Sequence, residues 1–185
     1  MKRLLVVVDF QKDFVDGALG FAGAEALEGP IADKIAAYRE RGDEVVFTLD
    51  THERGYLETQ EGRLLPVEHC MRGTDGHALY GTVADAVRAS DEVFDKPAFG
   101  SAGLFDWLRT AQRAADELGA RPFESIELVG LVSNICVISN AVLAKTACPE
   151  VPIIVDAACT ASFDGALNEK ALDVMEGLQM QVVNR

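Results

Sequence analysis

Short apolar runs rich in β-branched residues alternate along the chain with longer stretches of helical periodicity. The runs are LLVVV (4–8), EVVFTL (44–49), the weaker EVFDK (92–96), SIELVG (125–130), VPIIVD (151–156) and QMQVV (179–183). Strands that are buried on both faces form continuous apolar runs, because neither face needs polar side chains. These runs therefore predict buried strands of a parallel sheet.

Five stretches with helical periodicity fill the intervals between these runs. They cover residues 26–42, 82–90, 104–118, 133–147 and 166–178. Gly42 and Gly119 lie where helix C-caps belong. Strands that alternate with helices predict an α/β fold, a parallel β-sheet of about six strands with helices on both faces. Residues 51–80 interrupt the alternation with a long insert of little periodicity, and such inserts in compact domains are often functional.

The length and the net charge of the chain narrow its class. The 185 residues suffice for one domain with a sizeable core, and no linker or repeat divides them, so we expect a single domain over residues 1–185. The net charge of −13 disfavours nucleic acids and membrane surfaces as partners, because both are anionic. No segment approaches the roughly 18 apolar residues that a membrane span needs.

The cysteines and the first residues indicate the compartment. Cys70, Cys136, Cys148 and Cys159 form no CxxC pair and no short-spaced framework. A chain of this length with so few cysteines needs no disulfides for stability, which indicates the reducing cytoplasm. The start MKRLLVVVDF has the basic tip of a signal peptide, but its apolar run ends after five residues at Asp9 and no cleavage site follows. We therefore expect a cytoplasmic protein.

Polar side chains capable of chemistry follow most of the predicted strands. They are Asp9, Asp50 with His52, Lys96, Cys136 and Asp156, each at or just after the carboxyl end of a strand. Ligands of open α/β sheets bind at that edge. One aspartate alone is usually a turn residue, and one cysteine alone is usually a small buried hydrophobe. Their common edge favours a chemical role, although we interpret Asp156 as structural.

Cys136 is the candidate nucleophile. Ser133 or Asn134 is expected to cap the following helix, which would place Cys136 in the first turn, where the helix dipole and free amides stabilise a thiolate. A nearby Lys96 ammonium would lower the pKa of the thiol further. Asp9 could accept the thiol proton and return it to a leaving group. Together these groups indicate an acyl-transfer site.

Five segments carry a resemblance to a known family. They are VVVDFQKDF (6–14), TLDTH (48–52), PVEHC (66–70), FDKPAFGSAG (94–103) and GLVSNICVISNAV (130–142). In this order they resemble the isochorismatase-like cysteine hydrolases, in the branch that contains the nicotinamidases. The resemblance implies a Rossmann-like sheet, homo-oligomers and an Asp–Lys–Cys catalytic triad, here Asp9, Lys96 and Cys136.

The same resemblance implies the surroundings of the triad. It places a cis peptide bond before Val132, and it assigns the backbone amides of Val132 and Cys136 to the oxyanion hole. Phe14 and Phe99 match positions that line the substrate pocket.

A divalent metal site also follows from the resemblance. Nicotinamidases bind the metal through Asp-x-His and a later histidine, which correspond here to Asp50, His52 and His69. Some members add a glutamate between the two histidines, and Glu61 has the matching offset, with Glu68 as the competing residue. Zinc is the metal expected first, and manganese and iron accept the same ligands. His77 lies beyond the motif and is interpreted as a surface residue.

The chain departs from the nicotinamidase pattern at three places. Glu53 follows the first metal histidine where proline is common, and Ser133-Asn134 replaces Thr-Asp. Leu65 precedes Pro66 where an aromatic residue would stack on a pyridine ring, so Leu65 joins the expected pocket residues. Isochorismatases that cleave vinyl ethers lack the nucleophilic cysteine, and Cys136 therefore argues against that chemistry.

The sequence thus favours a cysteine amidohydrolase that converts nicotinamide to nicotinate, or a similar small amide, through a thioester. The Leu65 departure favours an alternative of the same fold, a hydrolase of N-carbamoyl or ureido compounds. A nucleotide-binding domain would need a glycine-rich turn after the first strand, and DFQKDFVDG contains no GxGxxG. A redox sensor would need a resolving cysteine, and Cys148 lies twelve residues beyond Cys136.

Overall fold

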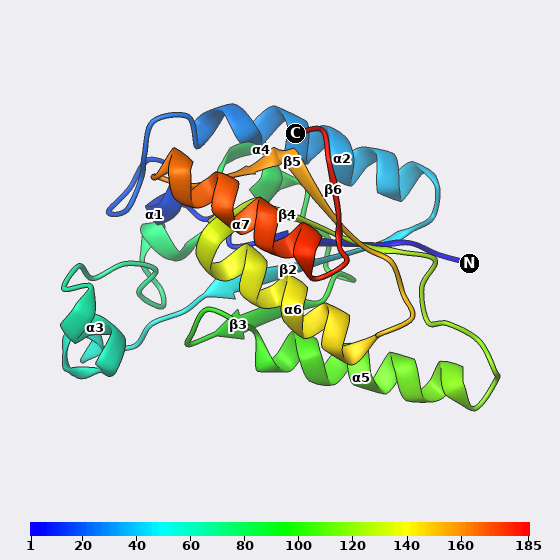
Figure 1. Cartoon of the computed structure of the whole chain (residues 1–185). Helices are drawn as coiled ribbons and strands as arrows, with labels where there is room; N and C mark the ends of the chain where they lie inside the picture. Colours follow the sequence, from blue (N-terminus) through cyan, green and yellow to red (C-terminus); the bar gives the residue numbers. More distant parts are fainter.

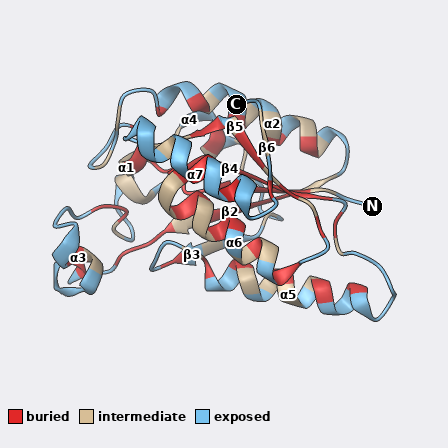
Figure 2. Cartoon of the chain, viewed as in Figure 1, coloured by how far each residue is buried: buried red, intermediate tan, exposed pale blue.

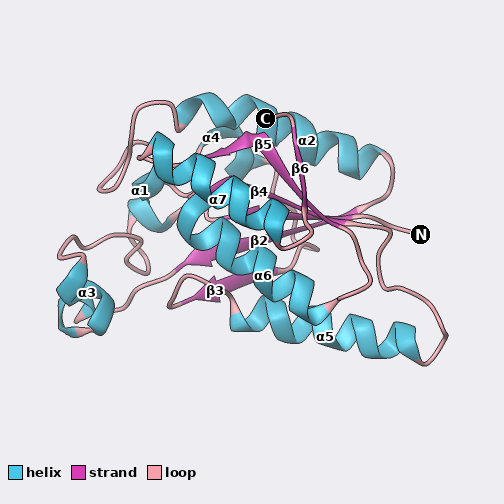
Figure 3. Ribbon diagram, in the orientation of Figure 1, coloured by secondary structure: helices cyan, strands magenta, loops and turns pink.

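The structure, a computed structural model that describes residues 1–185, contains one sheet of six parallel strands (Figures 1 and 3). The strands are β1 (Leu4–Val8), β2 (Glu44–Asp50), β3 (Val93–Lys96), β4 (Ile126–Leu131), β5 (Ile153–Ala161) and β6 (Gln181–Val183). Their order across the sheet is β3-β2-β1-β4-β5-β6, and every neighbouring pair is parallel. The predicted α/β class and strand number are confirmed.

Helices cover both faces of the sheet. They are α1 (Lys12–Val15), α2 (Glu28–Glu40), α3 (Gln60–Leu64), α4 (Gly81–Asp85), α5 (Ala102–Asp116), α6 (Ile138–Ala147) and α7 (Gly165–Gly177). Helices α5, α6 and α7 pack on one face, and α2 and α4 pack on the other (Figure 1). No helix has both the length and the apolar character that a membrane crossing requires.

The central strand β1 explains why this layering is stable. Figure 2 shows the middle of the sheet largely in red, the colour of buried residues. All five residues of β1 are fully buried, and they alternate between the two cores. Leu4, Val6 and Val8 belong to the core under α5, α6 and α7, whereas Leu5 and Val7 belong to the core under α2. Each buried Val or Leu side chain contributes roughly 1.5–3 kcal/mol relative to exposure to water.

The fifth strand is longer than the sequence predicts. It continues from Ile153 to Ala161, because its pairing with β4 shifts register between Leu128 and Gly130 and absorbs the extra residues. Asp156 therefore lies inside the strand and not at its end. Its carboxylate is 2.6 Å from the ammonium group of Lys34, so it takes part in an ion pair away from the carboxyl edge.

The helical segments differ from their predicted bounds mainly at the short elements. Helix α4 ends at Asp85, several residues earlier than expected, and the four-residue α1 had no periodic signal. Gly42 and Gly119 have φ of +75° and +61°, the left-handed conformation of helix C-caps. The insert 51–80 carries α3 and the short 3-10 turns η2 (Tyr56–Glu58) and η3 (Asp75–His77).

Gly130 gives a stability prediction. It lies in β4 beside Val8 with φ +108°, and a Cβ atom there would lie 2.0 Å from the Val8 carbonyl oxygen. We expect Gly130→Ala to lower the free energy of unfolding by roughly 3 kcal/mol, measured by urea denaturation, because both the φ angle and the contact oppose a side chain. Gly29→Ala in α2 is the control, since no atom lies within 4 Å of its Cβ position, and it should cost nothing. Equal stability of the two variants would contradict the prediction.

Candidate active site

Four chemically capable side chains meet at the carboxyl edge of the sheet. Asp9 follows β1, Asp50 ends β2, Lys96 ends β3, and Cys136 follows β4. The strand order reverses between β1 and β4, so Asp9 and Cys136 flank the switch point where ligands of such sheets bind. All four residues are buried, with at most 4% of any residue exposed.

Lys96 is the centre of this cluster. Its Nζ lies 2.7 Å from Asp9 Oδ2 and 3.4 Å from Cys136 Sγ, and it donates a hydrogen bond to the Ala98 carbonyl oxygen at 3.0 Å. The Thr48 hydroxyl donates to the other Asp9 oxygen at 2.7 Å. Both oxygens of Asp9 are therefore held in place beside the thiol.

The surroundings of Cys136 do not favour the thiolate that the sequence predicts. Burial raises the pKa of the Cys136 thiol well above its ordinary value, with Asp9 adding to the rise and Lys96 opposing it. Burial also works against the charge of Lys96, but the carboxylates of Asp9 and Asp50 outweigh it and raise the lysine pKa, so Lys96 stays charged. The resting thiol thus keeps its proton, and it needs a base at the moment of attack.

The turn that carries Cys136 is wider than an α-helical turn. Residues Ser133–Val137 form a π-helical turn (η4), in which Val137 N donates to the Val132 carbonyl oxygen five residues back at 3.1 Å. The peptide bond between Leu131 and Val132 is cis, as the resemblance implies. The extended residue Val132 precedes the turn, and α6 follows directly after it.

Neither Ser133 nor Asn134 caps this helix, and the expectation of a side-chain cap is wrong. Both residues already lie inside the π-helical turn, and the N-cap position belongs to Val132, which has no side chain able to accept a hydrogen bond. Ser133 Oγ and Asn134 Oδ1 have no hydrogen-bond partner. Cys136 is therefore presented by an uncapped π-helical turn and not by a capped α-helical one.

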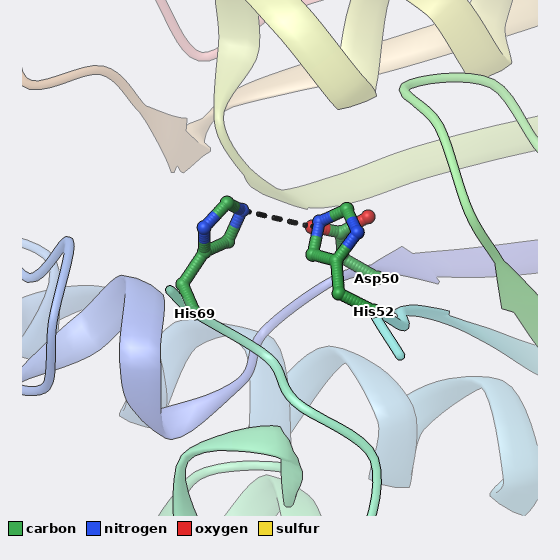
Figure 4. Close-up of side chains that lie close together, drawn as sticks. All are labelled: Asp50, His52 and His69. Atoms are coloured by element: carbon green, nitrogen blue, oxygen red, sulfur yellow. Dashed lines mark hydrogen bonds and ion pairs between the residues drawn. The ribbon is translucent and has the colours of Figure 1, made fainter. Parts of the chain in front are cut away.

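Asp50, His52 and His69 form a buried group of metal-ligand type beside the cluster (Figure 4). One donor atom from each lies within 4.8 Å of the others. Asp50 Oδ2 is 3.0 Å from His52 Nε2 and 3.3 Å from His69 Nε2. The sequence-derived ligands from β2 and the insert thus converge, although they are far apart in the chain.

The chemistry of this donor set fits a divalent metal. His69 Nδ1 is 2.8 Å from the Val67 carbonyl oxygen and donates to it, which orients the ring so that Nε2, the atom available to a metal, faces Asp50. Two imidazole nitrogens and one carboxylate suit zinc, and manganese or iron accept them as well. Glu61 Oε1 lies 3.8 and 3.9 Å from the two histidine Nε2 atoms, whereas Glu68 is exposed. Of the two glutamates, Glu61 is therefore the one that lies near the histidines.

Asp50 connects the two groups. Its Oδ2 faces the histidines, and its Oδ1 lies 3.2 Å from Lys96 Nζ. Burial works against the charged carboxylate, but hydrogen bonds from His52 and His69, together with Lys96, hold the pKa of Asp50 well below its ordinary value. One carboxylate therefore places the metal-ligand group beside the nucleophile.

A cavity of about 730 Å³ opens beside His52 of the metal-ligand group. It reaches Ala98 and Ile135, which neighbour Lys96 and Cys136 in the chain, but the side chains of the nucleophile cluster do not themselves line it. Leu65 from the insert and Phe99 from the loop after β3 also line it. Phe14 does not line this cavity, and its ring packs 5.6 Å from the ring of His69. The volume lies within the range of about 300–1,000 Å³ that is usual for small-molecule sites.

Two residues of the site were not foreseen from the sequence. Tyr56 packs its ring 4.5 Å from His52 and 5.1 Å from His69, and its hydroxyl donates to the Leu65 carbonyl oxygen at 3.0 Å. Gln11 bonds the backbone of Asp50 twice, accepting from N at 2.8 Å and donating to O at 2.9 Å. Gln11 belongs to a matched segment, which was a usable signal, whereas nothing in the sequence pointed to Tyr56.

His77 is not the free surface residue that the sequence suggested. Its ring is half-buried, and Nε2 lies 2.8 Å from the Thr51 hydroxyl oxygen. It lies in η3 and is not part of the metal-ligand group.

Comparison with known proteins gives one family and several relatives. The family model described as "Isochorismatase domain" matches residues 3–184. The nicotinamidase/pyrazinamidase of Mycobacterium tuberculosis is 31% identical over 157 residues, which cover 75% of this chain and 76% of that protein. Similarity therefore extends over most of both chains.

Solved structures agree with this likeness. A nicotinamidase/pyrazinamidase from Bacillus subtilis superposes with a TM-score of 0.82 at 29% identity, covering 98% of this chain and 99% of the other. An N-carbamoylsarcosine amidase from Thermoplasma acidophilum superposes with a TM-score of 0.75 at 26% identity, covering 98% and 95%. The fold is shared across its whole length.

Proposed function

Because this chain belongs to the isochorismatase family, we propose that it is a hydrolase of small amides that releases ammonia through a thioester on Cys136, with residues 1–185 acting as one hydrolase domain. One observation supports this most strongly, the buried contact of Lys96 with both Asp9 and Cys136 at the switch point. A base, a cation and a nucleophile together are what acyl transfer requires.

The first half of the mechanism forms the acyl-enzyme. Asp9 takes the proton of Cys136 as Sγ attacks the carbonyl carbon, and Lys96 keeps its charge and stabilises the anions. The backbone amides of Val132 and Cys136 hold the developing oxyanion. Collapse of the intermediate breaks the C–N bond, and Asp9 gives its proton to the departing ammonia.

The second half returns the resting enzyme. Asp9, now ionised, accepts a proton from water as the water attacks the thioester carbon. The C–S bond breaks, the carboxylic acid leaves, and the proton returns from Asp9 to Sγ. The raised pKa of the buried thiol favours this return.

A metal held by Asp50, His52 and His69, with Glu61 completing the set, would anchor a ring nitrogen of the substrate or a water near the acyl carbon. Zinc is the first choice, and manganese or iron are the alternatives. Tyr56 keeps both histidine rings in place by packing against them.

Metal content is the direct test of this assignment. We expect about one equivalent of metal in the purified protein by elemental analysis, and its loss in His52→Ala, because a ligand nitrogen is removed. His77→Ala is the matched control and should retain the metal. Glu61→Gln should bind metal more weakly than Glu68→Gln does. A metal-free wild type that is fully active would contradict the assignment.

Two substrate classes are candidates. Nicotinamide is the first, since the relatives named above include nicotinamidases. Carbamoyl compounds are the second, because Leu65 offers no aromatic ring for stacking and a carbamoyl amidase shares the fold. An ammonia-release screen with nicotinamide, pyrazinamide and N-carbamoyl compounds separates them. Release from none of these amides would overturn the proposed function.

The proposal includes a cytoplasmic location and a homo-oligomeric state. The four cysteines are all buried and unpaired, as in proteins of reducing compartments. The oligomer follows from the family resemblance, and light scattering of the purified protein tests it. A mass equal to the 19.9 kDa of one chain would contradict it.

A further inference from the structure

Asn140 lies one helical turn after Cys136, and its side chain is fully buried. Its amide group makes three hydrogen bonds to backbone atoms of two different segments. Nδ2 donates to the Cys136 carbonyl oxygen at 2.8 Å and to the Phe99 carbonyl oxygen at 3.2 Å, and Oδ1 accepts from Ser101 N at 2.9 Å. Both amide hydrogens are thus used, and both go to carbonyl groups near the cavity.

The segment that Asn140 holds is the loop between β3 and α5. This loop begins at Lys96 and ends at Ser101, whose hydroxyl caps α5 by accepting from Leu104 N at 3.1 Å. Phe99 lies between them and lines the cavity, yet 48% of it is exposed. Packing alone therefore does not fix Phe99, and two side-chain hydrogen bonds to the loop backbone restrain it, from Asn140 to the Phe99 carbonyl oxygen and from Lys96 to the Ala98 carbonyl oxygen.

We propose that Asn140 is a positioning residue that holds the Phe99 side of the cavity at a fixed distance from the turn that carries Cys136. One planar amide bonds the Cys136 and Phe99 carbonyl groups at once, so it sets the spacing between the nucleophile and the cavity wall. Asn140 does not line the cavity and acts only through these two segments. The kinetic consequence rests on the proposed function.

Asn140→Thr separates this role from simple support of the helix. A threonine hydroxyl in a helix commonly bonds the carbonyl group four residues back, here that of Cys136. The shorter side chain does not reach Phe99 and Ser101, so the loop is released while the helix keeps its bond. Asn140→Leu removes all three hydrogen bonds and leaves buried backbone groups unpaired, which endangers folding.

Steady-state kinetics of Asn140→Thr on the best amide of the screen measure the effect. We expect kcat/KM to fall about 30-fold, the effect of two hydrogen bonds of ordinary strength, with most of the change in KM because the Phe99 wall moves. Ser101→Ala is the control, since it removes the α5 cap and keeps the backbone bond to Asn140. Its kcat/KM should stay within about threefold of the wild type.

Alkylation of Cys136 by iodoacetamide, followed by peptide mass spectrometry, tests the same positioning role of Asn140 without any amide substrate. We expect the rate to rise about tenfold in Asn140→Thr and to stay unchanged in Ser101→Ala, because a loosened loop admits the reagent. If Asn140→Thr were alkylated faster but the wild type hydrolysed no amide, the positioning role of Asn140 would be supported and the proposed function would be overturned. If Asn140→Thr kept the KM and the alkylation rate of the wild type and lost only stability, seen as a lower urea midpoint, the positioning role of Asn140 would be wrong.

Discussion

Replacing Cys136 with alanine should lower ammonia release by about 10⁴-fold or more, to the background of the assay. The thiol supplies the bond to the acyl group, and the remaining side chains then have no nucleophile to activate. The protein should still fold, since the change removes one small buried atom. A coupled ammonia assay on the preferred amide measures the effect, with a urea titration to confirm the fold.

Cys148→Ala is the matched control for this variant. Cys148 is also buried, belongs to the same core as Cys136 and lies at the far end of α6. Its loss should affect stability to a similar extent and leave kcat unchanged. If both alanine variants kept wild-type activity, Cys136 would be a core residue and the nucleophile would have to be sought elsewhere.

Replacing Asp9 with asparagine should lower kcat by about 10³-fold, because the amide accepts no proton from the thiol. Shape is preserved. Asp9 has φ +45°, a conformation that asparagine tolerates, and the Thr48 hydroxyl can still donate to the side-chain oxygen. The asparagine nitrogen then takes the place of Oδ2 and cannot accept from Lys96, so the urea midpoint should fall. Lys96 keeps Asp50 as its charge partner at 3.2 Å, so the protein should still fold. Single-turnover and steady-state rates together show whether the chemical step is the one affected.

Asp156→Asn is the control that separates a loss of catalysis from the general effect of removing a buried carboxylate. Asp156 is likewise a buried aspartate paired with a lysine, but it lies inside β5 away from the carboxyl edge, whereas Asp9 follows β1 at that edge. This variant should lose stability and keep kcat. An Asp9→Asn enzyme with kcat within fivefold of the wild type would remove Asp9 from the mechanism.

The convergence of the site was predictable because it follows from sheet geometry. In a parallel sheet the carboxyl ends of all strands share one edge, so residues at the ends of apolar runs must meet there. Asp9, Lys96 and Cys136 meet for this reason, and no contact had to be known in advance. Asp156 was misplaced because a register shift inside a sheet leaves no local signal in the sequence.

The details of the Cys136 turn and of the supporting residues could not be predicted. Sequence favours an ordinary capped helix after Leu131, whereas tertiary packing stabilises a π-helical turn that no side chain caps. The high pKa of the thiol depends on its burial by distant segments. Tyr56 and Asn140 act through contacts across the chain, which local patterns do not encode.

The most direct test of the account is to find the acyl group during turnover. Wild-type protein mixed with its preferred amide, quenched in acid within the first turnovers and digested, can be mapped by peptide mass spectrometry. The account predicts an added acyl mass on the peptide that contains Cys136, and none on the peptides of Cys70, Cys148 or Cys159. An acyl group on any other residue, or ammonia release at the wild-type rate by Cys136→Ala, would contradict it.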